Sequence, residues 1–257
     1  AINRMPFMST HISEVAKISV LVLSYNHNEY IERCIESVFN NKSTSFNLEL
    51  IVIDDGSSDG TVEKLIRLKK NTPIEFHLYL KKHEGVTAIA KNLNEMVQRS
   101  TGDYISFLAS DDEYLPLRFD SQLKMMQSSN NYIAVYGNGL NRFNGEELGR
   151  VHPRSVVNLF TESSGKSLLN YITHQVPKVF IQSILVRSVF LKQDAAFDDD
   201  LIADDWVFNI KLLKRIVCSE MKIGYVDEDL FYRNMHNSNT SLNKIVHFKR
   251  VRQVAER

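Results

Sequence analysis

The chain has 257 residues, with 31 Lys+Arg and 31 Asp+Glu, so its formal net charge is zero. This balance provides no basic field, and we expect no nucleic-acid partner. Hydrophobic residues make up 43% and charged residues 24%, which is typical of a globular protein and excludes a disordered chain. Apolar runs fall far short of the roughly 20 residues that span a bilayer, and we expect a cytoplasmic protein.

The first half of the chain alternates between strand and helix patterns. Strands are predicted at 17–25, 48–54, 75–80 and 104–109, and helices at 28–41, around 62–66 and at 86–97. This alternation predicts βαβ units, and therefore an α/β fold with a mostly parallel sheet flanked by helices. In open sheets of this kind, ligands bind outside the carboxyl ends of the strands.

The second half is less regular. Helices are predicted at 117–127, 165–172 and 204–216, strands at 132–136, 180–186 and 223–232, and a turn-rich excursion or hairpin at 138–149. We therefore divide the chain into four parts: an N-terminal extension (1–16), a regular α/β half (17–137), a smaller mixed region (138–241) and a basic C-terminal helix (242–257).

Three of the predicted strands end in polar clusters. The first is followed by Ser24-Tyr25-Asn26, the second by Asp54-Asp55-Gly56 and the fourth by Ser110-Asp111-Asp112. We expect these clusters to converge on one crevice, because they share one edge of a parallel sheet. Paired carboxylates at a strand end suit Mg²⁺ or Mn²⁺, which leaves positions free for water and substrate phosphate. A plain surface turn explains the Asp111-Asp112 pair equally well.

The other candidate residues also have structural explanations. Asp55 is able to accept hydrogen bonds from a nucleobase and Tyr25 to stack on it, although an ordinary turn accounts for the Asp54-Asp55 loop alone. Asp204 and Asp205 begin a predicted helix, where acids favour the helix dipole, and a carboxylate there is also placed to act as a general base. His236 is either structural or a metal ligand.

Missing motifs narrow the chemistry. The chain has no Gly-x-Gly-x-x-Gly after the first strand, no phosphate-binding Gly-x-x-x-x-Gly-Lys-Ser/Thr and no Gly-x-Ser-x-Gly. Dehydrogenases, P-loop kinases and α/β-hydrolases therefore lose their best support.

The ordered set of motifs resembles the family 2 glycosyltransferases of the GT-A fold. Residues 18–26, 51–61 and 102–116 resemble that family's first strand, nucleotide-binding loop and metal strand, and Asp204-Asp205-Trp206 with residues 236–241 extends the match. The resemblance implies a GT-A Rossmann-like sheet in which 17–137 binds a nucleotide sugar. The mixed region 138–241 then binds the acceptor and carries catalysis.

The resemblance also implies an inverting transferase that moves a sugar from a nucleotide diphospho-sugar to a hydroxyl of a saccharide or glycolipid acceptor. The resemblance further implies a role in cell-surface polysaccharide assembly, with the protein located in the cytoplasm or at the inner face of the membrane. Asp205 is the implied base, and Mn²⁺ or Mg²⁺ is the implied cofactor. The implied donor contacts are Ser24, Tyr25, Asn26, Asp54, Asp55, Lys91 and Ser110, and the implied metal ligands are Asp111, Asp112 and His236.

Two other functions stay open. A sugar-nucleotide-forming nucleotidyltransferase also uses strand-end carboxylates and magnesium. Ala109, where the family usually has Asp, leaves room for a catalytically degenerate GT-A binding module. The basic segment is interpreted as a solvated helix face, with peripheral association with an anionic membrane as the weaker alternative; its cationic residues are Lys244, Lys249, Arg250, Arg252 and Arg257.

Overall fold

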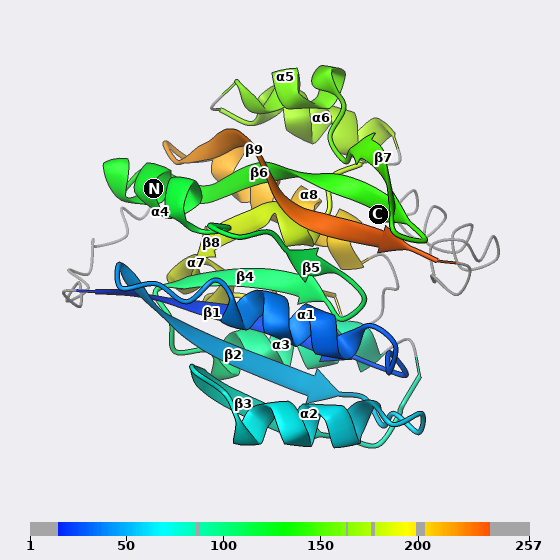
Figure 1. Cartoon of the computed structure of the whole chain (residues 1–257). Coiled ribbons are helices and arrows are strands. Elements are labelled where there is room, and N and C mark those ends of the chain that lie inside the picture. The colour runs from blue at the N-terminus through cyan, green and yellow to red at the C-terminus, as the bar shows by residue number, and fades with distance from the viewer. Residues whose placement is uncertain (1–14, 86–87, 163, 176–177, 199–203, 237–257) are drawn as a thin grey trace.

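The computed structural model describes residues 15–85, 88–162, 164–175, 178–198 and 204–236. Within these ranges it forms one nine-stranded sheet with helices on both faces (Figure 1). The α/β prediction is confirmed. The predicted basic helix at 242–257 and nearly all of the extension at 1–16 lie outside the described residues.

The regular half contains the four predicted strands in the order β3-β2-β1-β4, all parallel. They are β1 (Ala16–Ser24), β2 (Phe46–Asp54), β3 (Glu75–Leu80) and β4 (Tyr104–Ala109), connected through α1 (Ile31–Phe39), α2 (Thr61–Lys70) and α3 (Ala88–Arg99). β1 and β2 are buried along most of their length, because helices cover both faces of the sheet there.

The second half extends the sheet with mixed pairing. β8 (Ile184–Arg187) is antiparallel to β4 and β6, and β6 (Tyr132–Phe143) is parallel to β9 (Lys222–Met235). β6 turns back into β7 (Glu146–Arg150) as the predicted hairpin. The remaining elements are β5 (Glu113–Tyr114), α4 (Asp120–Ser128), α5 (Arg154–Phe160), α6 (Lys166–His174), the 3₁₀ turn η1 (Ile181–Ser183), α7 (Ser188–Lys192) and α8 (Asp204–Val217).

Several sequence-based element bounds differ from the structure, and two of the differences have a local cause. The helix expected from 117 begins only at Asp120, because Leu117 has φ of 61°, a left-handed conformation that a helix does not accommodate. The strand expected at 180–186 is confined to β8. In η1 the carbonyls of Gln182 and Ser183 accept side-chain hydrogen bonds from Arg118 and Gln122, rather than bonds from a neighbouring strand.

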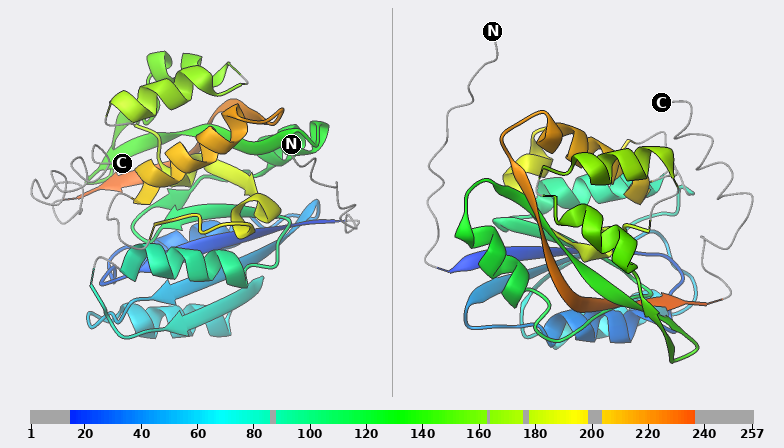
Figure 2. Two further views of the ribbon diagram at one scale, coloured as in Figure 1. Left: turned by 180° about the vertical axis from the view of Figure 1, so that it is seen from behind. Right: turned by 90° about the horizontal axis from the view of Figure 1, so that it is seen from above.

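Two apolar layers fix the sheet between its helices. One layer joins the sheet to α1, α2 and α4, and the other joins it to α3, α6 and α8 (Figure 2). β2, β4 and β9 point to the same side of the molecule, so their carboxyl ends form one edge, which we call the carboxyl edge (Figure 1). In the described part of the chain, no helix is both long and apolar enough to cross a bilayer.

Candidate active site

The three predicted polar clusters share the carboxyl edge. Ser24 is the register partner of Asp54, and Leu23 is the partner of Ala109, so the ends of β1, β2 and β4 lie side by side. Helix α8 begins on the same side of the molecule (Figures 1 and 2). The parallel sheet therefore gathers loops that are far apart in sequence, as expected.

A tight loop follows β2. The Asp54 carboxylate is fully buried and accepts hydrogen bonds from the Ser57 amide at 2.8 Å and the Ser57 hydroxyl at 2.7 Å. Gly56 has φ of 81°, and a Cβ added there would lie 2.6 Å from the backbone nitrogen of His83. The Asn26 amide donates to the Ser57 hydroxyl at 2.8 Å. Asp54 and Asn26 thus shape the loop, and their direct contact with a donor stays a prediction.

Asp55 and Tyr25 are joined through His83. One carboxylate oxygen of Asp55 lies 2.7 Å from His83 Nδ1, and the other accepts a hydrogen bond from Asn92 Nδ2 at 3.1 Å. The His83 ring stacks on the Tyr25 ring at 4.0 Å with an interplanar angle of 9°. Tyr25 is 41% exposed, whereas Asp55 is 5% exposed. The edge therefore presents an aromatic face beside a fixed hydrogen-bond acceptor.

Two other predicted donor residues lie near this group in the fold. Ser24 is fully buried, and its hydroxyl has no hydrogen-bond partner among the described residues. Lys91 extends from α3 and is largely exposed, with its ammonium 3.3 Å from a Glu84 carboxylate oxygen. An ion pair between exposed side chains is weak, so Lys91 is able to exchange Glu84 for another anion.

Asp111 and His236 come together although 125 residues separate them. His236 Nε2 lies 3.1 Å from Asp111 Oδ2, and both side chains are largely buried. Adjacent ligands of an octahedral cation are about 3 Å apart, because metal–oxygen distances near 2.1 Å meet at right angles. The pair fits two neighbouring positions in such a coordination shell.

Asp112 is oriented differently from Asp111. Both of its carboxylate oxygens accept hydrogen bonds, one from Gln182 Nε2 at 2.6 Å and the other from the Asn234 amide at 2.8 Å. Burial, followed by the neighbouring charge of Asp111, raises the pKa of Asp112 well above its usual value. Of the two predicted acidic ligands, Asp111 is therefore better placed to bind a metal ion. Asp112 instead connects the turn after β4 to β9.

Two aromatic side chains hold His236 in place. Tyr30 stacks on it at 4.5 Å, and His27 meets it edge-on at 6.2 Å. His27 Nδ1 lies 2.6 Å from the hydroxyl of the predicted donor residue Ser110. Burial lowers the pKa of His27, although the negative charge of Asp111 opposes the shift. A neutral His27 ring thus connects the end of β4 to His236.

Sequence reasoning missed His27 and His83. A signal was available for each: His27 directly follows the polar cluster Ser24-Tyr25-Asn26, and His83 lies just beyond β3, a strand end that the sequence argument left aside. Both histidines contact residues that were predicted from the sequence, namely Ser110 and Asp55.

Asp205 lies in the first turn of α8. The next residue, Trp206, donates its indole N–H to the Ile172 carbonyl at 2.5 Å. Phe208, three residues after Asp205, packs edge-on against Phe107 of β4, with ring centroids 5.6 Å apart. These contacts hold the start of α8 beside the end of β4. The approach of Asp205 to Asp55 and Asp111 around one crevice stays a prediction.

A second group of titratable residues lies at the opposite edge of the sheet. Glu49, Glu75 and His77 belong to the amino-terminal parts of β2 and β3, and their ligand atoms all lie within 4.8 Å of one another. A cavity of about 750 Å³ also opens at this amino edge, where Lys17 and Glu75 are among its lining residues. Neither feature belongs to the crevice expected from the sequence.

The chain belongs to Glycosyl transferase family 2, whose family model matches residues 19–187. It is 27% identical over 181 residues to a teichuronic acid biosynthesis glycosyltransferase named TuaG from Bacillus subtilis, which covers 70% of this chain and 69% of the relative. It is also 39% identical over 123 residues to a glycosyltransferase from Rickettsia bellii, which covers 48% of this chain. The chain spans only 17% of that relative's length.

Solved structures share the fold. TarS residues 1–349 from S. aureus, in complex with UDP-GlcNAc, match with a TM-score of 0.71 at 18% identity, covering 93% of this chain and 66% of that 1–349 chain. The mannosyltransferase PcManGT from Pyrobaculum calidifontis, in complex with GDP-Man and Mn²⁺, matches with a TM-score of 0.66 at 17% identity, covering 93% and 63%. The GT-A fold predicted from the sequence is confirmed.

Proposed function

We propose that this protein is an inverting, metal-dependent glycosyltransferase that moves a sugar from a nucleotide diphospho-sugar to an acceptor hydroxyl. The observation that carries the proposal is the joint placement of two groups at the carboxyl edge. One is the Tyr25–His83–Asp55 group, and the other is the Asp111–His236 pair. A donor has two matching ends, a flat base with hydrogen-bonding groups and a diphosphate that binds divalent cations.

The base end of the donor fits Tyr25 and Asp55. An aromatic face supplies stacking, and a carboxylate accepts a hydrogen bond from a base N–H. Asp55 is already oriented by His83 and Asn92, so little ordering is needed when a nucleotide binds. Lys91 supplies a mobile cation for the diphosphate, and the Ser110 hydroxyl lies next to the metal residues.

The diphosphate end fits a divalent cation held by Asp111 and His236. The 3.1 Å separation suits adjacent ligands of Mn²⁺ or Mg²⁺, and the imidazole nitrogen favours Mn²⁺ over the harder Mg²⁺. Asp112 fixes the backbone of the turn. When bound, such an ion stabilises the negative charge that grows on the departing nucleoside diphosphate.

Asp205 is the proposed general base. Its carboxylate accepts the proton of the acceptor hydroxyl while that oxygen forms a bond to the anomeric carbon. The bond between this carbon and the diphosphate oxygen breaks on the opposite face, and its electron pair leaves with the nucleoside diphosphate. One displacement therefore inverts the anomeric configuration, and no covalent sugar–enzyme intermediate forms.

The relatives suggest the setting of the reaction. TuaG is named for teichuronic acid biosynthesis, and the solved relatives were bound to UDP-GlcNAc or GDP-Man. We extend this to a saccharide or glycolipid acceptor in cell-surface polysaccharide assembly, at the cytoplasmic side of the membrane. Peripheral association with that membrane is part of the proposal.

The test is to incubate the full chain with Mn²⁺, a panel of nucleotide diphospho-sugars and saccharide or glycolipid acceptors. Release of nucleoside diphosphate together with a product of inverted anomeric configuration supports the proposal. Release of pyrophosphate from a nucleoside triphosphate and a sugar phosphate would instead identify a nucleotidyltransferase. Donor binding by calorimetry without turnover across the panel would favour a degenerate binding module.

A further inference from the structure

Two carboxylates and a histidine lie on one face of the sheet at its amino edge. Glu49 in β2 and Glu75 in β3 are register partners on adjacent parallel strands. His77 lies two residues after Glu75, and its side chain is therefore on the same face of β3. Strand pairing places these three side chains, so their grouping depends on the sheet itself and requires no loop.

The two separations that involve His77 are close to those of a tetrahedral metal site. His77 Nε2 lies 2.9 Å from Glu75 Oε1 and 3.7 Å from Glu49 Oε1. Ligand atoms bound to Zn²⁺ at 2.0–2.2 Å in tetrahedral geometry are roughly 3.4 Å apart, so the observed distances lie on either side of this value. The Glu75 and His77 side chains are 47% and 40% exposed, which leaves the group open to ions from solvent.

Glu49 is held rigidly, since its carboxylate is almost fully buried. Thr101 donates its amide to Glu49 Oε2 at 2.9 Å and its hydroxyl to Oε1 at 2.7 Å, and Ser19 donates its hydroxyl to Oε2. A ligand fixed in this way loses little conformational entropy when it binds an ion. The arrangement therefore supplies one pre-oriented ligand and two that are accessible.

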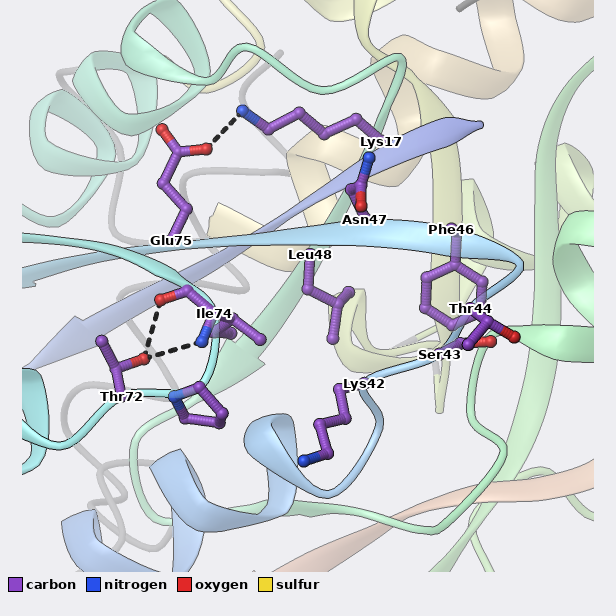
Figure 3. Close-up of a pocket in the computed structure, with 11 residues that line it drawn as sticks. Lys17, Lys42, Ser43, Thr44, Phe46, Asn47, Leu48, Thr72, Ile74 and Glu75 are labelled. Atoms are coloured by element: carbon purple, nitrogen blue, oxygen red, sulfur yellow. Dashed lines mark hydrogen bonds and ion pairs between the residues drawn. The ribbon is translucent and has the colours of Figure 1, made fainter. Parts of the chain in front are cut away.

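Lys17 at present provides the positive charge. Its ammonium lies 2.6 Å from Glu75 Oε2 and 3.6 Å from Glu49 Oε1, and Figure 3 shows Lys17 reaching toward Glu75. Lys17 also lines the cavity of about 750 Å³, which gives its long side chain space to withdraw. With Lys17 withdrawn, the two carboxylates carry a charge of −2, which a divalent cation balances.

We propose that Glu49, Glu75 and His77 form a second metal site, selective for divalent transition ions of the Zn²⁺ class. The Lys17 ammonium competes with the metal ion for the two carboxylates. The site lies at the opposite edge of the sheet from Asp111, and it takes no part in sugar transfer. A bound ion connects the amino ends of β2 and β3, and β3 is the outermost strand of the parallel half. Loading with metal therefore stabilises this edge.

The test uses the full chain carrying Asp111→Asn and His236→Gln, so that the carboxyl edge contributes no metal binding. Co²⁺ is titrated into the chelator-treated protein and followed by the visible absorption of tetrahedral Co²⁺, and Zn²⁺ is then added in competition. We expect one saturable site. In this background His77→Gln should weaken it at least tenfold, whereas Lys17→Met should strengthen it about tenfold. His174→Gln, which changes an exposed histidine elsewhere, is the matched control.

Absence of tetrahedral Co²⁺ absorption overturns the proposal, as does binding that His77→Gln leaves unchanged or that Lys17→Met weakens. If the double background fails to fold, the wild-type chain answers the same question by thermal unfolding. Zn²⁺ should raise its midpoint through both edges, and His77→Gln should reduce that rise; an equal rise in both proteins refutes the site. Neither assay measures sugar transfer, so failure here is independent of the proposed function.

Discussion

The two edges of the sheet each bring carboxylates and histidines together, but they position them in different ways. At the carboxyl edge, Asp55, Asp111 and His236 lie just beyond strand ends, and each depends on a histidine or aromatic partner from another loop. At the amino edge, Glu49 and Glu75 lie within strands, where the register sets their positions. The carboxyl edge thus gathers side chains from several loops, whereas the amino edge holds a charged cluster whose positions follow from strand register.

The largest expected effect separates chemistry from binding at the carboxyl edge. Asp205→Asn removes the proposed base, so transfer should fall by about 10²- to 10⁴-fold, while donor affinity measured by calorimetry should change little. The control is Asp194→Asn, because Asp194 is a mostly exposed acid near Arg215. Turnover of Asp205→Asn close to that of the control would falsify the base assignment.

The second effect concerns the ion proposed for the same edge. His236→Gln should raise the Mn²⁺ concentration for half-maximal transfer by about 10- to 100-fold, because a ligand is lost beside Asp111. Activity measured across a Mn²⁺ titration after chelator treatment checks this. His174→Gln, at an exposed position, should leave the titration unchanged. An unaltered Mn²⁺ requirement in His236→Gln would remove His236 from the metal site.

At the amino edge a substitution should affect stability instead of donor binding. Glu49→Gln removes a buried charge that Lys17, Ser19 and Thr101 all contact, and we expect a loss of about 2 kcal/mol in the free energy of unfolding. Urea unfolding measures this loss. Calorimetric affinity for the donor should not change, and a large drop in donor affinity would show that the two edges are coupled.

The same variant gives a pH test. Burial raises the pKa of Glu49, but hydrogen bonds from Ser19 and Thr101 and the charge of Lys17 outweigh it, so the pKa lies below 4.5. A carboxylate whose pKa is lowered by folding stabilises the fold at pH values above its pKa in the unfolded chain. This contribution is lost as the pH falls through its pKa in the folded protein. The stability gap between wild type and Glu49→Gln should therefore stay constant from pH 7 to 5 and narrow below 4.5.

The smallest effect probes the base contact. Tyr25→Leu should weaken nucleotide diphosphate binding about tenfold, because stacking on an aromatic ring contributes on the order of 1 kcal/mol. Tyr25→Phe keeps the ring and should bind almost as well as wild type in the same calorimetric titration. Equal weakening in both variants would assign the contact to the phenol oxygen rather than to stacking.

The sequence was sufficient to predict the parallel half and the polar strand ends, because period-2 and period-3.6 patterns are strong there and parallel strands align their carboxyl ends. The positions of His27 and His83 next to strand ends were a signal, but their contacts could not be predicted, since each has its partner in another segment, Ser110 or Asp55. The Glu49–Glu75–His77 group was missed for a related reason. It exists only once the register of β2 and β3 is known.

The position of β9 has a consequence for how the protein assembles. This strand, the last one in the described part of the chain, lies between β6 and β5, and residues at its end contact Asp112 and Asp111. A nascent chain that stops at residue 187 therefore contains the loop after β2 yet lacks the groups that organise the acidic turn. Long-range pairing of this kind is slow to form. Competence for the proposed metal-dependent chemistry should thus arise late in folding, after β9 has paired with β6 and β5.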